Sequence, residues 1–298
     1  MTDPRVLVLG GGGMLGHKVY QTLKERCDVY ATFRRFNDRL QKTAIFEAKQ
    51  VVDGVDAWDM PSVARAVSET RATWVVNCIG IIRQLDEARD PKTSIYVNAL
   101  FPHLLSQACK SAGTRLIHVS TDCVFTGKKG DYVEDDPSDA EDLYGKTKYL
   151  GEIDYPHALT LRTSIVGRDL FSDLSLVDWF LGQSGKTAKG YTNAIYTGLS
   201  TSAVSREIWR VISEHPELHG LYHVSSSKIT KFAFLTLVNR FFKVGVTLEP
   251  FDGIRCDRSL VSHRYGRAAG FIAPDWETMV REMATDPTPY DRFRQAGD

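Results

Sequence analysis

Three side chains in the middle of the chain have types and a spacing suited to acid–base chemistry. Thr121 follows an apolar run at 116–120, and Tyr144 and Lys148 lie four positions apart in a segment with a helical pattern. Positions four apart share one helix face, so the phenol and the ammonium are neighbours. A free tyrosine has a pKa of about 10, which a nearby positive charge lowers toward the range of a general acid–base group. The set could hold a carbonyl oxygen and give it a proton, although an ordinary surface Tyr and Lys would show the same spacing.

A glycine-rich turn near the N-terminus predicts a site for a dinucleotide. The apolar run at 5–9 leads directly into glycines at 10–13 and 16, and a helical pattern follows to about residue 25. A strand, a glycine turn and a helix in this order seat a pyrophosphate on the helix N-terminus. We expect the contacts to come from Gly10, Gly13, Met14, Leu15 and Gly16. A merely flexible glycine loop is the alternative.

The residues after the second predicted strand favour a phosphorylated cofactor. Residues 28–33 form this strand, and Arg34 and Arg35 follow it. Units that prefer NAD usually place an acidic residue here for the ribose 2′-hydroxyl, whereas two guanidinium groups suit a 2′-phosphate. The sequence therefore predicts that NADP(H) is preferred and that NAD(H) can still bind. Two solvated loop arginines would look the same.

Strands that alternate with helices predict an α/β fold with a Rossmann-type doubly wound parallel sheet. We expect a dinucleotide-binding domain at 1–167, to which about 200–225 returns, and a smaller C-terminal α/β substrate lobe mainly within 168–298. Asp59 is expected to cap a helix that runs to about residue 69. Further strands are expected at 51–53, 73–77, 116–120, 158–162 and 220–225.

The second half of the chain has a weaker pattern. Residues 184–198 are rich in small and polar residues and are predicted to form a loop, and 251–270 is predicted to be irregular. The phenylalanines at 232, 234, 241 and 242 are expected to form the core of the lobe. Helices are expected at about 90–112, 174–181, 203–214, 230–242 and 275–283, the last one capped by Asp275.

Composition excludes several classes of function. The formal net charge is zero, so a nucleic-acid partner is not expected. No apolar run approaches the roughly 20 residues that span a bilayer, so no membrane partner is expected. The five cysteines lack metal-binding spacing, so no metal site is expected and a cytoplasmic, reducing location is the simpler inference.

With these residues placed, the chain resembles the extended short-chain dehydrogenase/reductase family, and within it the nucleotide-sugar 4-reductases of the dTDP-4-dehydrorhamnose reductase type. The resemblance extends over nearly the whole chain and is strongest through residue 167. It rests on the glycine turn, Asn77-Cys78-Ile79-Gly80, Asp86-Glu87 with Pro91, Val97-Asn98, residues 120–127, residues 144–152 and Leu161-Arg162-Thr163-Ser164.

The resemblance implies roles for individual residues. Thr121 would help to hold the keto oxygen, Tyr144 would donate the proton, and Lys148 would lower the Tyr144 pKa and bind the nicotinamide ribose. Asp56 matches a position that contacts adenine. The other implied cofactor contacts are Cys78, Ile79, Gly80, Asn98, Ser120, Thr163, Ser164 and Ile165. The implied substrate contacts are Ile81, Asp122, Cys123, Val124 and Arg258, the last one for a diphosphate.

Two departures from the family pattern bear on the substrate. Rhamnose-type reductases usually carry an aromatic residue where this chain has Cys123 and a tryptophan where it has Ile165. The resemblance therefore implies NADPH-dependent reduction of the C4 keto group of a related nucleotide-activated 4-keto-6-deoxyhexose. Surface polysaccharide biosynthesis and a homodimer, which relatives often form, are implied in the same way.

Other reactions use the same scaffold. A 4,6-dehydratase would carry a second carboxylate in place of Cys123. An epimerase or epimerase-reductase would use Cys123 together with a histidine, which 167–180 lacks. A non-catalytic NADP-binding regulatory protein commonly loses the tyrosine or the lysine, and both are present here.

Overall fold

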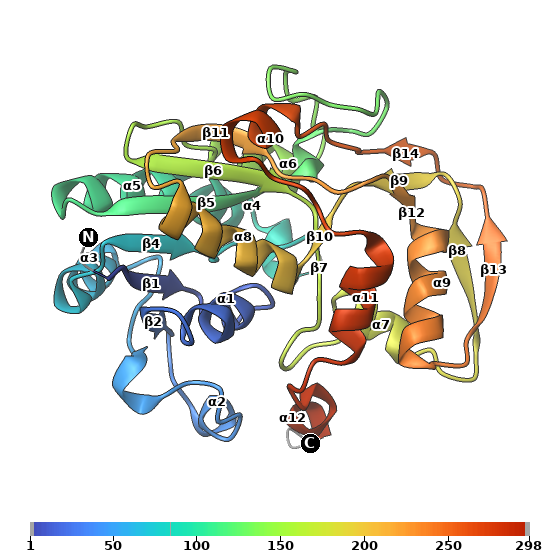
Figure 1. Ribbon diagram of the computed structural model, residues 1–298, viewed down its shortest axis with the longest axis horizontal. Helices are drawn as coiled ribbons and strands as arrows, with labels where there is room; N and C mark the ends of the chain where they lie inside the picture. Colours follow the sequence, from blue (N-terminus) through green and yellow to red (C-terminus); the bar gives the residue numbers. More distant parts are fainter. Residues whose placement is uncertain (1–2, 84, 296–298) are drawn as a thin grey trace.

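The computed structural model describes residues 3–83 and 85–295, and its centre is a seven-stranded sheet whose paired strands are all parallel (Figure 1). The strand order is β11-β6-β5-β4-β1-β2-β3, which is that of a doubly wound sheet and confirms the predicted fold class. The strands are β1 (Arg5–Leu9), β2 (Asp28–Thr32), β3 (Val51–Val52), β4 (Trp74–Asn77), β5 (Arg115–Thr121), β6 (Ala158–Thr163) and β11 (Gly220–His223).

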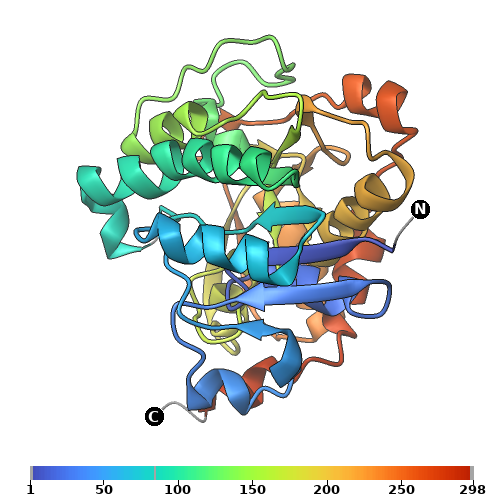
Figure 2. The ribbon, with the colours of Figure 1, turned by 90° about the vertical axis from the view of Figure 1, so that its left-hand side faces the viewer.

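The alternation of side chains along each strand creates a core on both faces of the sheet. In β1, Val6 and Val8 face one layer, whereas Leu7 and Leu9 face the other. The first layer contains α1 (Gly16–Leu23) and α8 (Thr201–Glu214), and the second contains α3 (Met60–Thr70) and α5 (Phe101–Ser111). Figure 2 shows the helices on the two sides of the sheet. Burial on both faces explains why β1 and β4 are mostly apolar.

The helix predicted at 90–112 forms in three consecutive parts. Asp90 caps it by accepting hydrogen bonds from the N–H groups of Lys92 and Thr93. The parts are α4 (Pro91–Ser94), a π-helical stretch (Ile95–Leu100) and α5, and the π-helical stretch packs against α6 (Leu143–Leu150). Asp59 occupies the N-cap position of α3, as predicted, but its side chain makes no capping hydrogen bond.

A smaller set of strands and helices follows β6 and forms the lobe at one side of the sheet (Figure 1). Phe234 is fully buried in its core beside Trp276, while the other three phenylalanines of that group are partly buried. The division at residue 167 stays a prediction. The strands are β7 (Ile165–Val166), β8 (Thr187–Tyr191), β9 (Ala194–Tyr196), β10 (Leu199–Ser200), β12 (Ile229–Thr230), β13 (Thr247–Phe251) and β14 (Cys256–Asp257).

Residues 184–198 are not a loop, contrary to our prediction. They contain β8 and β9, which pair with β13, β12 and β14 from the last third of the chain. Gly190 suits a strand here because a Cβ atom would lie 2.6 Å from the Phe232 ring. Residues 251–270 are also more regular than predicted. The lobe helices are α7 (Leu176–Leu181), α9 (Lys231–Phe242), α10 (His263–Ala269), α11 (Trp276–Ala284), which Asp275 caps, and α12 (Tyr290–Gln295); a short α2 (Asp38–Gln41) follows β2.

Candidate active site

The end of β5 carries a threonine whose hydroxyl shapes the turn that follows. The Thr121 hydroxyl accepts a hydrogen bond from the Cys123 N–H at 3.1 Å and donates one to the Asp122 carboxylate at 3.2 Å. Before it, the Ser120 hydroxyl donates to Glu152 at 2.7 Å. Thr121 is the last residue of β5, so it lies at the carboxyl edge of the parallel sheet, where α/β folds bind ligands.

Gly145 lets α6 approach this turn closely. A Cβ atom at position 145 would lie 2.3 Å from the Cys123 carbonyl oxygen and 2.7 Å from the Ala140 Cβ. Asp142 caps the helix by accepting a hydrogen bond from the Gly145 N–H at 3.0 Å. This contact brings Tyr144, the residue before Gly145, to the turn that Thr121 begins, and the Thr121 side chain acts to lower the pKa of Tyr144.

The environment of Tyr144 keeps its phenol protonated. Burial raises the pKa of Tyr144, and Cys123 raises it further, while Thr121 and Arg83 act in the opposite direction. The net shift is upward because the cost of burying a phenolate is larger than the stabilising contacts, and the expected lowering of this pKa by Lys148 stays a prediction. A phenol that holds its proton at neutral pH is suited to donate it.

Lys148 lies one helical turn after Tyr144 and is buried. Its ammonium donates a hydrogen bond to the Val119 carbonyl oxygen at 3.0 Å. Burial lowers the pKa of Lys148 to about 8, against the opposing charge of Glu152. The structure thus brings Thr121, Tyr144 and Lys148 to one edge of the sheet, and their catalytic roles stay predictions.

Cys123 and Arg258 form a wall beside the three residues. An Arg258 guanidinium nitrogen lies 3.7 Å from the Cys123 sulfur, and its Nε donates to the Phe125 carbonyl oxygen at 2.8 Å. Burial raises the pKa of the Cys123 thiol to about 11 and also raises the pKa of the Asp122 carboxyl. Val124 is fully buried in a small apolar cluster, so its side chain has no surface for the substrate contact that we predicted.

The turn after β4 packs over the glycine turn. A Cβ atom at Gly10 would lie 3.1 Å from the Ile79 side chain and 3.3 Å from the Cys78 backbone. Asn98 fixes the continuation of this turn through two bonds of 2.9 Å with the backbone of Ile81. The predicted cofactor residues after β4 therefore adjoin the glycine turn.

The glycine turn has the geometry that a pyrophosphate site needs. Gly10 has a φ of +79°, and a Cβ atom at Gly16 would lie 2.1 Å from the Gly10 carbonyl oxygen. Leu15 precedes α1 without a capping side chain, so no side chain of that residue competes with an anion at this helix end, where the His17 N–H already bonds to the Gly13 carbonyl oxygen at 3.2 Å. The donor set fits a dinucleotide phosphate.

The remaining predicted cofactor residues lie on the same side of the fold. Arg34 and Arg35 follow β2 with exposed side chains, and the structure gives neither an ion pair within residues 3–83 and 85–295. The Asp56 carboxylate accepts a hydrogen bond from the Trp58 N–H at 3.0 Å, so in the free protein it stabilises a local turn. Thr163, Ser164 and Ile165 continue from β6 into β7, on the strand next to Thr121.

Three residues around the site were missed by the sequence analysis. Arg83 pairs with Asp142 at 2.6 Å, and its guanidinium lies 5.8 Å from the centre of the Tyr144 ring. The Tyr196 hydroxyl is buried and has no hydrogen-bond partner among the described residues. Glu152 forms a buried ion pair with Arg162 at 2.5 Å. Of the three, only Glu152 could have been found from the sequence, because it lies four positions after Lys148, as Lys148 lies four positions after Tyr144.

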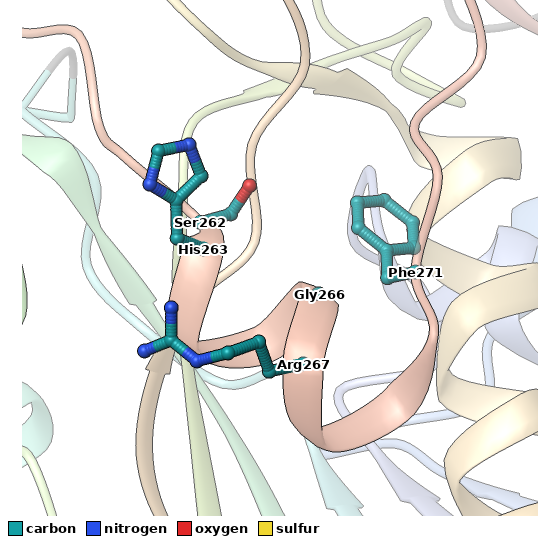
Figure 3. Close-up of a pocket in the computed structure, with 5 residues that line it drawn as sticks. All are labelled: Ser262, His263, Gly266, Arg267 and Phe271. Atoms are coloured by element: carbon teal, nitrogen blue, oxygen red, sulfur yellow. The ribbon is translucent and has the colours of Figure 1, made fainter.

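A hollow of about 420 Å³ beside α10 is separate from these residues. It is lined by Ser262, His263, Gly266, Arg267 and Phe271 (Figure 3). None of the predicted site residues lines it, so we do not assign it to the substrate. Within the described residues, no group of His, Cys, Asp or Glu could hold a metal ion, and no helix is long and apolar enough to cross a membrane.

The sequence is similar to those of nucleotide-sugar reductases. It is 33% identical to "dTDP-4-dehydrorhamnose reductase" of Streptomyces griseus over 50% of this chain and 44% of that protein. It is 26% identical to "Spore coat polysaccharide biosynthesis protein SpsK" of Bacillus subtilis over 93% of this chain and 96% of that protein. The match to the Streptomyces griseus protein spans less than half of that protein's length, whereas the match to the Bacillus subtilis protein spans nearly the whole of both chains.

Solved structures share the fold. The dTDP-4-dehydrorhamnose reductase of Bacillus anthracis, solved in complex with NADP, superposes with a TM-score of 0.78 at 22% identity and covers 96% of this chain and 100% of its own. The family model described as "RmlD substrate binding domain" matches residues 4–287. The chain therefore belongs to the RmlD substrate-binding family.

Proposed function

We propose that this protein is an oxidoreductase that uses NADPH to reduce the C4 keto group of a nucleotide-activated 4-keto-6-deoxyhexose. The observation that carries the proposal is the placement of Thr121, a protonated Tyr144 and Lys148 at the carboxyl edge of β5. Two relatives support it, because the first is named a dTDP-4-dehydrorhamnose reductase and the second a polysaccharide biosynthesis protein.

The cofactor would lie along the carboxyl ends of β1, β2 and β4. The glycine turn and the N-terminus of α1 would hold the pyrophosphate, and Arg34 and Arg35 would hold the 2′-phosphate. Bound there, the nicotinamide supplies the hydride for C4. Lys148, whose ammonium already points to the Val119 carbonyl at the strand edge, would hold the nicotinamide ribose.

The chain's own residues provide the proton and the orientation of the substrate. The Thr121 and Tyr144 hydroxyls would both contact the keto oxygen, and Tyr144 would give its proton to the oxygen as negative charge develops. The raised pKa of Tyr144 favours this direction because the phenol remains protonated at neutral pH. Lys148 would stabilise the phenolate that is left until a solvent proton restores the phenol.

Arg258 is placed to bind the substrate's diphosphate. It lies against Cys123, which is two residues after Thr121. Among the arginines at 255, 258, 264 and 267, which we expected as a group to be able to hold this diphosphate, it is the one with a hydrogen bond to Cys123 or Phe125 in the described part of the chain. Arg264 instead pairs with Asp135 at 2.5 Å and is the matched control. Arg258→Ala should weaken nucleotide-sugar affinity while turnover at saturation persists, and Arg264→Ala should leave both unchanged. Equal affinity in Arg258→Ala and the wild type would remove this contact.

An epimerase or epimerase-reductase is the second candidate, because Cys123 lies next to the reacting groups. Its raised pKa makes the thiol a poor base at neutral pH, which favours simple reduction. Incubation in D₂O decides between them, since epimerisation places deuterium at C3 or C5 of the sugar and reduction does not. A homodimer and a cytoplasmic location stay predictions, and sedimentation of the purified protein tests the first.

The proposal is tested by following NADPH oxidation at 340 nm (the absorbance of the reduced nicotinamide). The wild type and Tyr144→Phe receive dTDP-, UDP- and GDP-linked 4-keto-6-deoxyhexoses. We expect oxidation with one nucleotide sugar in the wild type and a loss of about 100-fold or more in Tyr144→Phe. NADPH that binds but is not oxidised with any sugar would favour the regulatory alternative.

A further inference from the structure

The last described residues of the chain form a clasp across the cofactor helix, which we define as residues 286–294. Lys18 of α1 forms an ion pair with Asp286 and donates to the Thr288 hydroxyl at 3.3 Å. Gln21 donates to the same hydroxyl at 3.1 Å. The C-terminal segment is therefore fixed to the helix that begins at the glycine turn.

The clasp reaches the glycine turn itself through one buried histidine. The His17 ring is fully buried, with Nδ1 at 2.9 Å from the Gly13 carbonyl oxygen and Nε2 at 3.0 Å from the Tyr290 hydroxyl. A carbonyl oxygen can only accept a hydrogen bond, so Nδ1 carries the proton. Nε2 is then the acceptor, and the Tyr290 hydroxyl must donate to it.

The ring stays neutral, which keeps this chain of hydrogen bonds in one direction. Burial is the main cause that lowers the pKa of His17 to about 4; the adjacent Lys18 charge acts in the same direction, and the Gly13 hydrogen bond, Asp286 and Asp178 oppose it. If His17 only filled space in the core, an apolar side chain would serve as well and no hydrogen-bond partners would be needed. Both nitrogens have partners, and the partners lie 4 and 273 positions away in the sequence.

The Gly13 carbonyl is the group that the histidine fixes. It accepts hydrogen bonds from the His17 backbone N–H at 3.2 Å and from the His17 ring. Because the peptide bond is planar and trans, fixing this carbonyl also fixes the following N–H, of Met14, in the opposite direction. That N–H points away from the helix, toward the side of the turn where phosphates bind at helix N-termini.

We propose that Tyr290 and His17 are positioning residues for the dinucleotide, through which the clasp holds the Gly13–Met14 peptide in the orientation that binds the pyrophosphate. The inference rests on the proposed use of NADPH. The clasp also contacts the segment after β7, because Arg168 donates to Asp291 at 2.5 Å and Arg294 pairs with Asp178 at 2.7 Å. It therefore joins the cofactor helix to the lobe.

The test compares two ligands that differ in the pyrophosphate. Tyr290→Phe keeps the ring and removes the hydroxyl that donates to His17. We expect the Kd for NADPH to rise about 5-fold, the equivalent of one hydrogen bond, and the Kd for adenosine 2′-monophosphate to stay unchanged because this ligand lacks the pyrophosphate. A general loosening of the fold would weaken both ligands.

Tyr20→Phe is the matched control. Its hydroxyl lies on the same helix and donates to Gln50 at 2.6 Å, without a connection to the glycine turn. We expect this variant to lose thermal stability and to retain wild-type NADPH affinity. Equal NADPH affinity in Tyr290→Phe and the wild type would overturn the inference, whereas a wild type that binds no NADPH would overturn the proposed function instead.

Discussion

Lys148 allows a quantitative prediction, because burying its charged side chain lowers the stability of the folded state. Burial lowers the pKa of Lys148 from 10.5 to about 8. At about 1.4 kcal/mol for each tenfold change in proton affinity, this difference costs the folded state about 3 kcal/mol at neutral pH. The hydrogen bond to the Val119 carbonyl oxygen returns about 1 kcal/mol. Lys148→Met should therefore raise the free energy of unfolding at pH 7 by about 2 kcal/mol.

The sign of the pH dependence follows from the two pKa values. Below pH 8 the lysine is charged in both the folded and the unfolded protein, and the cost of burial is complete. Between pH 8 and 10.5 the unfolded protein binds more protons, so the stability of the wild type rises with pH. The methionine variant lacks this gain, and its advantage should shrink over the same interval.

Urea unfolding at pH 7 and pH 9.5 measures both effects. Lys146→Met is the control, because Lys146 lies on the same helix with an exposed side chain and should show no change in stability. Lys148→Met should also lose most reductase activity. A Lys148→Met protein that is less stable than the wild type at pH 7, or whose advantage does not change with pH, would refute the reasoning.

Three further predictions concern the walls of the site. Gly145→Ala should lower kcat/KM about 100-fold while NADPH still binds. The added Cβ atom would lie 2.3 Å from the Cys123 carbonyl oxygen, so α6 must move by about 1 Å. Gly266→Ala is the control and should have no such effect, because its Cβ atom would have its nearest neighbour at 3.7 Å. Tyr196→Phe should leave the free energy of unfolding unchanged or raise it by about 1 kcal/mol, because it removes a buried hydroxyl without a partner in the described structure; clear destabilisation in urea would contradict this. Arg34→Ala with Arg35→Ala should raise the Kd for NADPH about 10-fold or more and leave the Kd for NADH nearly unchanged, and an equal loss for both cofactors would argue against a 2′-phosphate contact.

The sheet and its cofactor turn could be predicted because their signals are local. Residues 6–9 are all apolar, as is typical of a strand buried on both faces, and Gly10 and Gly16 are needed where backbone meets backbone. Spacing alone also put Tyr144 and Lys148 on one helix face. The strand order confirms the predicted fold, and the family model that matches residues 4–287 confirms the predicted family.

The remaining features depend on contacts between distant residues. Residues 187–191 form a strand only because 247–251 pair with them, and their own composition is that of a loop. The Tyr144 pKa depends on burial by several elements, which the spacing of residues along the chain does not reveal. The contact between His17 and Tyr290 could not be predicted either, because it joins residues that lie 273 positions apart in the sequence.

The central claim is that hydride passes to C4 of the sugar while Tyr144 supplies the proton. The most direct measurement uses NADPH deuterated at C4 of the nicotinamide, with the nucleotide sugar that supports oxidation, and locates the label in the product by NMR. We expect one deuterium at C4 of the hexose, none at C3 or C5 when the solvent is D₂O, and transfer slowed by about 100-fold or more in Tyr144→Phe. With both C4 hydrogens of the nicotinamide replaced by deuterium, a reduced hexose that lacks deuterium at C4, or solvent deuterium at C3 or C5, would contradict it.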